Sequence, residues 1–139
     1  MLIDEATRFG ARVAERLRTE TIIWLTVAGR DGTPHPNPVW FHWEGGDSVL
    51  VYNRRDAQRL RAIERNPRVA LHFDSDKGGN IVIFQGLAKI EPNEPPAHTV
   101  TAYVERYRAR IERMHLTPAA FAAAYPIATR IRLTKLLGF

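Results

Sequence analysis

Apolar residues along the chain fall into short runs separated by turn-forming residues, a pattern that indicates a protein built mainly from β-strands. The run TIIWLTVA is nearly all apolar and rich in β-branched residues, as expected of a strand covered on both faces. We predict six strands, over residues 21–28, 35–44, 48–53, 68–74, 80–91 and 127–137. Gly86 lies inside the fifth strand, where it predicts a bulge or a close approach of another backbone.

Four other segments repeat their apolar residues every three or four positions or carry helix-start signals, which predicts helices. They cover residues 4–18, 53–68, 97–114 and 117–125. Asp56 is the predicted N-cap of the second helix, and Thr117, followed by a proline, is that of the fourth. The third helix is predicted to carry one apolar stripe, formed by Ala97, Val100, Val104, Tyr107, Ile111 and Met114.

The order of these elements indicates the fold class. Strands that follow one another directly favour antiparallel pairing, and they do not alternate with helices as a doubly wound parallel sheet requires. We therefore expect an α+β, mainly β protein, with six antiparallel strands in a small closed or half-open barrel and helices on its flanks. A length of 139 residues suits a single domain that spans residues 1–139.

The second predicted strand has an unusual run of prolines at positions 34, 36 and 38. Because alternate N–H groups of a strand point to the same edge, these prolines remove the donors from one edge only. That edge is expected to stay unpaired. It either protects the sheet against aggregation or forms a backbone shelf for a flat ligand, flanked by Asn37 and by Trp40 or Trp43.

The composition narrows the chemistry. The net charge is +5, and arginine supplies 17 of the 20 basic residues, which suits either an anionic partner or a solvated basic surface. There is no cysteine, so disulfides and thiolate chemistry are excluded. No apolar run approaches the roughly 20 residues of a membrane span, and the first residues lack the form of a signal peptide. We expect a cytoplasmic protein with no membrane association.

Arginine is concentrated in residues 53–68, which hold six arginines against Asp56 and Glu64. Arg54 and Arg55 lie where a strand gives way to a helix, so their guanidinium groups adjoin the free N–H groups of the first helical turn. Both kinds of group favour an anion, although a solvated helix face explains the same composition.

Catalytic signatures are otherwise absent: the chain has no phosphate loop, no HExxH, no GxSxG and no EF-hand loop. The five histidines, at 35, 42, 72, 98 and 115, lack the spacing of metal ligands on one element. We therefore expect no metal and no catalytic side chain, and we infer that a bound cofactor would supply the reactive group of an enzyme.

Several motifs together resemble a known family. They are P-x-P-V-W-F at 36–41, Y-x-R at 52–54, Q-R-L at 58–60, R-N-P-R-V-A-L at 65–71, F-Q-G-L-A at 84–88 and the final R-x-R-L-T-K-L-x-G-F. In this order and spacing they resemble the pyridoxamine 5′-phosphate oxidase-like split β-barrels (FMN-binding split barrels). More narrowly, they are similar to the actinobacterial branch that uses the deazaflavin coenzyme F-420.

The resemblance implies a homodimer with two cofactor sites at the subunit interface. The cofactor ring would lie against Asn37, Pro38, Val39, Trp40 and Phe41, and the phosphate near Tyr52, Asn53, Arg54, Gln58 and Arg59. Arg59 stands where many relatives have lysine, which keeps the charge. Gly86 would let a neighbouring strand come close, and Arg130 and Lys135 are candidates for the second subunit's contribution.

The implied activity is hydride transfer from carbon 5 of reduced deazaflavin to an unsaturated, planar conjugated small molecule. Three alternatives stay open. The first is an FMN-binding oxidoreductase or flavin carrier with the same fold. The second is a haem-binding split barrel with His42 or His72 as the axial ligand. The third is a basic protein that binds nucleic acid without catalysis, although no nucleic-acid motif is present and we expect no such partner.

Overall fold

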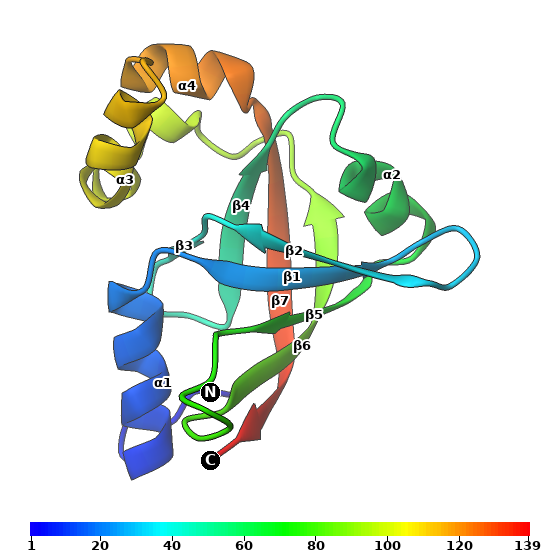
Figure 1. Ribbon diagram of the computed structural model, residues 1–139, viewed down its shortest axis with the longest axis vertical. Coiled ribbons are helices and arrows are strands. Elements are labelled where there is room, and N and C mark those ends of the chain that lie inside the picture. Colours follow the sequence, from blue (N-terminus) through cyan, green and yellow to red (C-terminus); the bar gives the residue numbers. More distant parts are fainter.

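The computed structural model describes residues 1–139 and contains one antiparallel sheet of seven strands. The sheet curls into a half-open barrel, with strand order β2-β1-β5-β6-β7-β4-β3 (Figure 1). The strands are β1 (Ile23–Ala28), β2 (Pro34–Val39), β3 (His42–Trp43), β4 (Ser48–Asn53), β5 (Arg68–His72), β6 (Val82–Ile90) and β7 (Ile127–Gly138). The α+β, mainly β class is confirmed, but the expected number of six strands is wrong.

The seventh strand arises because the predicted segment 35–44 is divided in two. Its first part, β2, pairs with β1 as far as Val39, and its last two residues, β3, pair with β4 at the opposite edge of the sheet. Between them, the Phe41 N–H donates to the Tyr107 hydroxyl over 3.0 Å. A side chain from a distant helix thus holds the bend at which the chain crosses between the two edges.

The helices are α1 (Arg8–Thr19), α2 (Gln58–Arg65), α3 (Thr101–Arg113) and α4 (Pro118–Ala124), with a short 3-10 turn, η1 (Ala97–Thr99). The first begins later than predicted because the Thr7 hydroxyl accepts the Gly10 N–H over 2.9 Å and caps it there. The Thr117 cap of α4 is confirmed by its bond from the Ala120 N–H. No helix has the length and apolar character needed to cross a bilayer.

The predicted helix 97–114 is in fact η1 followed by α3. Both the N–H and the hydroxyl of Thr99 donate to the Pro96 carbonyl, which closes a tight turn there. Val100 is then extended, and α3 starts at Thr101. Tyr103, Val104, Tyr107 and Ile111 are buried, whereas Met114 is 39% exposed.

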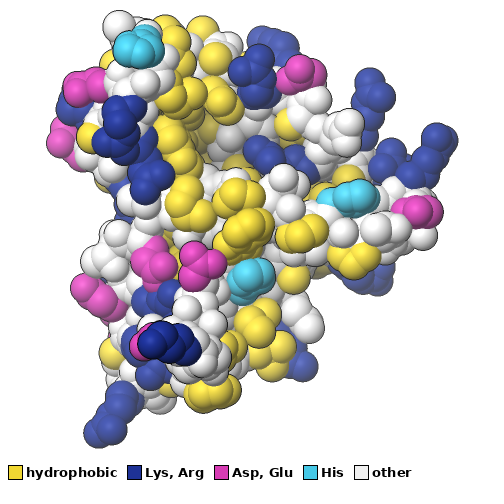
Figure 2. Space-filling model, in the orientation of Figure 1, with side chains coloured by type: hydrophobic (Ala, Val, Ile, Leu, Met, Phe, Trp, Pro, Cys, Tyr) yellow, Lys and Arg dark blue, Asp and Glu magenta, His cyan; other side chains and the backbone are white.

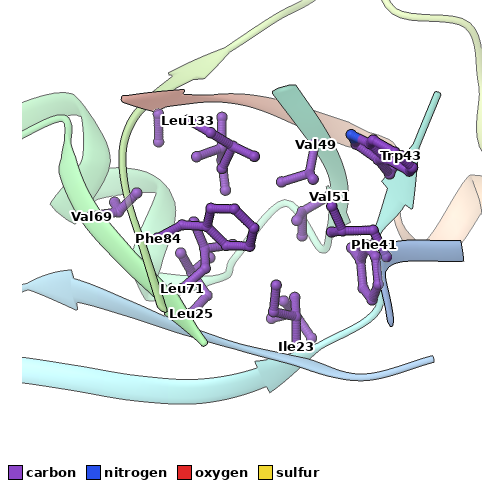
Figure 3. Close-up of a cluster of buried hydrophobic side chains, with 14 of the residues drawn as sticks. Ile23, Leu25, Phe41, Trp43, Val49, Val51, Val69, Leu71, Phe84 and Leu133 are labelled. Atoms are coloured by element: carbon purple, nitrogen blue, oxygen red, sulfur yellow. The ribbon is translucent and has the colours of Figure 1, made fainter. Parts of the chain in front are cut away.

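Two clusters of buried side chains flank β4. Val49 and Val51 face the inside of the curled sheet, where they meet Ile23, Leu71 and Phe84 (Figure 3). The alternate residues of β4, Leu50 and Tyr52, belong to a second cluster beneath α3 and α4. Because successive side chains of a strand point to opposite faces, this one strand supports both layers.

Gly86 interrupts the regular pairing of β6 with β7, as predicted. The register shifts between Gln85 and Gly86, and a Cβ atom at Gly86 would lie 2.9 Å from the Arg132 carbonyl oxygen. The close approach of the two backbones therefore requires glycine at this position.

Candidate functional site

The edge formed by the prolines is present. β2 is the outermost strand, and the Gly29 N–H donates to the Thr33 carbonyl at the hairpin turn over 2.7 Å. Hydrogen-bonded and non-bonded residue pairs alternate along an antiparallel pair of strands. Counted from the bonded pair Gly29–Thr33, His35, Asn37 and Val39 lie in bonded pairs with β1, and the three prolines lie in the non-bonded pairs between them. The outer edge of β2 therefore offers carbonyl groups but no N–H donors at positions 34, 36 and 38.

A cavity of about 420 Å³ lies at the end of this strand, between β2, the end of β4, the start of α2, and helices α3 and α4. We call it the aromatic pocket. It is lined by Pro38, Val39, Trp40, Tyr52, Arg54, Ala57, Arg59, Tyr103, Met114, Phe121 and Tyr125. Figure 2 shows hydrophobic side chains continuing from α3 and α4 down to the β1–β2 hairpin on this face.

Stacked rings form one wall of the aromatic pocket. Trp40 lies parallel to Tyr107, with 4.6 Å between ring centroids, and 5.2 Å from Phe121. Phe121 in turn stacks on Tyr125 at 4.5 Å. Because each ring is held by its neighbours, this wall is rigid, and its aromatic surface suits an apolar or aromatic ligand. Trp43, the alternative to Trp40 in the sequence, is buried in the core instead.

A second cavity, of about 520 Å³, runs between the β1–β2 hairpin and α2. It is lined by Val27, Gly29, Arg30, His35, Pro36, Asn37, Gln58, Arg59, Ala62 and Arg65. We call it the basic groove, because it contains three arginines and no carboxylate. Arg59 lines both cavities, so the aromatic pocket and the basic groove meet at its side chain.

Arg59 is held in place by a buried asparagine. The Arg59 Nε–H donates to the Asn53 Oδ1 over 2.6 Å, and the Asn53 amide donates to the carbonyls of Val51 and Ile127. None of the ion pairs in the chain includes Arg59. Burial lowers the pKa of Arg59, but arginine remains charged at physiological pH. Its positive charge is therefore fixed and uncompensated, as an anion site requires.

The start of α2 adds backbone donors beside Arg59. The prediction that Asp56 caps this helix is wrong: Ala57 is the N-cap, and no side chain bonds to the first turn. The Asp56 carboxylate instead lies 3.5 Å from the Arg54 guanidinium, because the chain turns once more before the helix begins. The free N–H groups of the first turn carry a partial positive charge that favours an anion.

The structure brings most of the predicted site residues together. Those that line the aromatic pocket are Pro38, Val39, Trp40, Tyr52, Arg54 and Arg59, and those that line the basic groove are Asn37, Gln58 and Arg59. Phe41 and Asn53 are fully buried behind these walls. Burial raises the pKa of Tyr52 to about 12, and its hydroxyl donates to the Pro95 carbonyl.

Gly86, Arg130 and Lys135 lie away from both cavities. Gly86 lines a separate hollow of about 720 Å³ that is formed by strand and turn residues. The Arg130 guanidinium is paired with the Glu94 carboxylate at 2.7 Å, and Lys135 is exposed on β7.

Sequence reasoning missed several lining residues, chiefly Arg30, His35, Tyr103, Phe121 and Tyr125. Arg30 and His35 reach the groove only because the hairpin folds beside α2, and no local pattern reports that contact. Tyr103 lies one position before Val104 of the predicted stripe. Four tyrosines and phenylalanines spaced along 103–125 were the available signal, although core packing explains such residues equally well.

The two histidines considered as haem ligands are both engaged elsewhere. His42 is buried, burial lowers its pKa, and its Nε2 lies 3.4 Å from the Glu44 carboxylate. His72 stacks on Trp24, and its Nδ1 is 3.1 Å from the Phe73 carbonyl. Neither ring lines the aromatic pocket or the basic groove.

The curled, half-open antiparallel sheet with helices on its flanks fits the class of the split β-barrels. The family model for pyridoxamine 5′-phosphate oxidase matches residues 9–134, and the chain therefore belongs to this family. No curated protein has a significantly similar sequence.

Solved structures with the same fold carry several functions in their descriptions. One described as an F420 reductase is 25% identical, with a TM-score of 0.64 over 88% of this chain and 94% of the other. The conserved hypothetical protein Rv2991 from Mycobacterium tuberculosis is 24% identical, with a TM-score of 0.69 over 91% and 81%. HutZ, described as the heme storage protein from Vibrio cholerae, is 15% identical, with a TM-score of 0.61 over 95% of each chain.

Proposed function

We propose that this protein is an F-420-dependent oxidoreductase, which transfers a hydride from the reduced deazaflavin to an unsaturated, planar conjugated small molecule. One observation carries the proposal: an aromatic pocket and a carboxylate-free basic groove meet at the fixed charge of Arg59. A ligand that fits both cavities has a planar ring at one end and anionic groups at the other. The similarity to an F420 reductase supports the same conclusion.

The residues present fit a phosphorylated deazaflavin. Pro38, Val39 and Trp40 would hold the ring, while Arg54, Gln58 and Arg59, together with the free N–H groups of α2, would bind the phosphate. Arg30 and Arg65 would face the polyanionic oligoglutamate tail of F-420 farther along the groove. This placement also accounts for the excess of arginine over lysine.

When bound, the deazaflavin supplies the hydride. The chain's own residues would hold the ring flat against the outer edge of β2, position an acceptor in the rest of the aromatic pocket and limit the access of water. No side chain is required to act as an acid or base in this scheme, which agrees with the lack of catalytic motifs.

FMN is the second candidate cofactor, because the family as a whole is described by pyridoxamine 5′-phosphate oxidase. It has the ring and the phosphate but lacks the polyanionic tail. F-420 is therefore expected to bind the wild-type protein more tightly than FMN, and the difference is expected to shrink as salt screens the groove. Tighter binding of FMN at all salt concentrations would favour the FMN oxidoreductase or flavin carrier.

We also propose that two copies form a dimer with the cofactor sites at their interface. The hollow around Gly86, formed by strand and turn residues, is a surface that a second copy would cover. Lys135 and the Arg130–Glu94 pair lie on strands and loops outside the two cavities, so in this arrangement they reach a cofactor only across the interface. Sedimentation equilibrium with and without F-420 tests the assembly, and a monomer under both conditions would refute it.

The cofactor proposal is tested by titrating F-420 and FMN into the wild-type protein and into the variants Arg54→Ala, Arg59→Ala and Arg8→Ala. Arg8 is an exposed residue of α1, far from α2 in Figure 1, and serves as a control with the same loss of charge. Each lost charge-assisted bond is worth about 1.5–3 kcal/mol, or roughly 10- to 150-fold in Kd. Unchanged affinity in both site variants would refute the phosphate assignment, and failure of both cofactors to bind would refute the redox function.

A further inference from the structure

The aromatic pocket contains a buried polar side chain that the proposed cofactor site does not use. Tyr103, on α3, is 1% exposed overall and lines the pocket. Its ring is fixed on several sides, with centroid distances of 4.8 Å to Tyr107, 5.1 Å to Tyr52 and 6.2 Å to Phe121. The side chain therefore has little freedom to turn its hydroxyl elsewhere.

The Tyr103 hydroxyl makes no hydrogen bond within the chain, unlike those of its two nearest tyrosine neighbours. The Tyr52 hydroxyl donates to the Pro95 carbonyl, and the Tyr107 hydroxyl bonds to the backbone of Thr21 and Phe41. The Tyr103 hydroxyl oxygen is not fully sealed in the protein either, because a small part of its surface stays accessible. Because Tyr103 lines the aromatic pocket, the pocket is the route by which a ligand would reach this hydroxyl.

The other side-chain donors of the lining differ from Tyr103: Trp40, Arg54, Arg59 and Tyr125 are more exposed, and the Tyr52 hydroxyl is already bonded. The Tyr103 hydroxyl is therefore the buried, unbonded donor that a ligand in this pocket would meet. Burial raises the pKa of Tyr103, so this hydroxyl keeps its proton and acts as a donor throughout the physiological range. A donor that meets no acceptor in a bound complex loses its contact with water and costs binding energy. The pocket should therefore favour flat molecules that carry an acceptor oxygen at this point over flat hydrocarbons.

We propose that Tyr103 is a ligand-binding residue, whose hydroxyl donates a hydrogen bond to the carbonyl oxygen of a planar conjugated ring held in the aromatic pocket. Two sources can provide that oxygen: the acceptor molecule, or a ring carbonyl of the cofactor. The inference rests on the proposed function in that it takes this pocket as the place where these rings bind. The inference adds the chemical group, the Tyr103 hydroxyl, that selects among the rings that can bind there.

The test uses the full chain without cofactor and a matched pair of probes, 2-acetylnaphthalene and 2-ethylnaphthalene, which differ in the ketone oxygen. Binding is followed by NMR through the indole N–H signal of Trp40. Trp24 and Trp43 serve as internal controls, because their indole N–H groups are bonded to Asp74 and Gly46 outside the pocket. In the wild-type protein we expect the ketone to bind more tightly and to shift the Trp40 signal selectively.

Tyr103→Phe removes the hydroxyl and keeps the ring. We expect it to weaken binding of the ketone by roughly fivefold, the equivalent of one neutral hydrogen bond, and to leave the hydrocarbon unchanged. Tyr107→Phe is the matched control, because its hydroxyl bonds to the backbone of Thr21 and Phe41 and its residue lines neither cavity, so the preference for the ketone should survive even if the melting temperature falls. A merely structural role would alter the melting temperature without altering the ratio of the two affinities.

Equal affinities of the two probes for the wild-type protein would overturn the inference, and so would an unchanged ratio of these affinities in Tyr103→Phe. If the variant does not fold, the wild-type measurement alone still tests the inference. Titration of F-420 into Tyr103→Phe then identifies the source of the oxygen: a matching loss indicates the cofactor ring, and unchanged affinity indicates the acceptor. If neither F-420 nor FMN binds wild-type protein, the proposed function fails while the ketone preference remains a separate result.

Discussion

Replacing Asn53 by alanine is expected to destabilise the protein far more than an average polar substitution. Asn53 is fully buried, and its amide donates to the Ile127 carbonyl at 2.9 Å and the Val51 carbonyl at 3.1 Å. Its oxygen accepts the Arg59 Nε–H at 2.6 Å. Two neutral bonds at about 1 kcal/mol each and one to a charged group at about 2 kcal/mol give an expected loss of about 4 kcal/mol.

The same loss can be expressed as a melting temperature. An unfolding entropy of about 2.1 cal/mol/K per residue gives about 0.29 kcal/mol/K for a chain of 139 residues, so Tm should fall by about 14 °C. Urea unfolding supplies the free energy and calorimetry the Tm. Asn66→Ala is the control, because the Asn66 side chain makes one exposed bond, to the Arg68 N–H, and should cost less than about 1 kcal/mol.

A double-mutant cycle with Arg59→Ala isolates the contact between the two side chains. We expect a coupling energy of about 1.5–3 kcal/mol, since the two groups are in direct contact and one is charged. A loss below about 1.5 kcal/mol for Asn53→Ala, or additive effects in the cycle, would show that Asn53 does not hold Arg59 in place.

Three further predictions concern other parts of the molecule. Gly86→Ala would place a Cβ atom 2.9 Å from the Arg132 carbonyl and should cost about 1–3 kcal/mol by urea unfolding, whereas Gly46→Ala meets nothing within 4 Å and should be neutral; equal effects would contradict the close approach. Burial lowers the pKa of His42, so as the pH falls below about 6.5 the unfolded chain binds this proton before the folded protein does. The free energy of unfolding should therefore fall more in wild type than in His42→Gln between about pH 7.5 and 5.5, and an equal fall in both proteins would contradict the shift. Pro36→Thr adds an N–H donor to the outer edge of β2 and should raise self-association in light scattering with little change in Tm, and unchanged scattering would count against edge protection.

Features that depend on one residue's own chemistry were predictable from the sequence. The prolines at 34, 36 and 38 lack N–H groups wherever they lie, so an unpaired edge followed directly. Gly86 indicated the bulge because only glycine tolerates so close a neighbouring carbonyl. The Thr117 cap was equally local.

Features that depend on distant contacts were not predictable. The extra strand exists because Tyr107 holds the backbone of Phe41 at a bend, and these two residues are far apart in the sequence. The family resemblance implied that Asn53 lies near the cofactor phosphate, but its side chain is fully buried and bonds to the Ile127 carbonyl of β7 and to Arg59 of α2. The pattern of apolar residues reports burial, but it does not report which elements meet.

β7 has a consequence for the synthesis of this protein. It alone joins β6 to β4, and it is the last strand in the order of the chain (Figure 1). Every other strand therefore leaves the ribosome before the sheet can be completed, and the nascent chain carries two partial sheets with unpaired edges at β4 and β6. Such edges invite aggregation until β7 arrives. Substitutions in β7 should accordingly lower the yield of folded protein during translation, even where they change the free energy of unfolding of the folded protein only slightly.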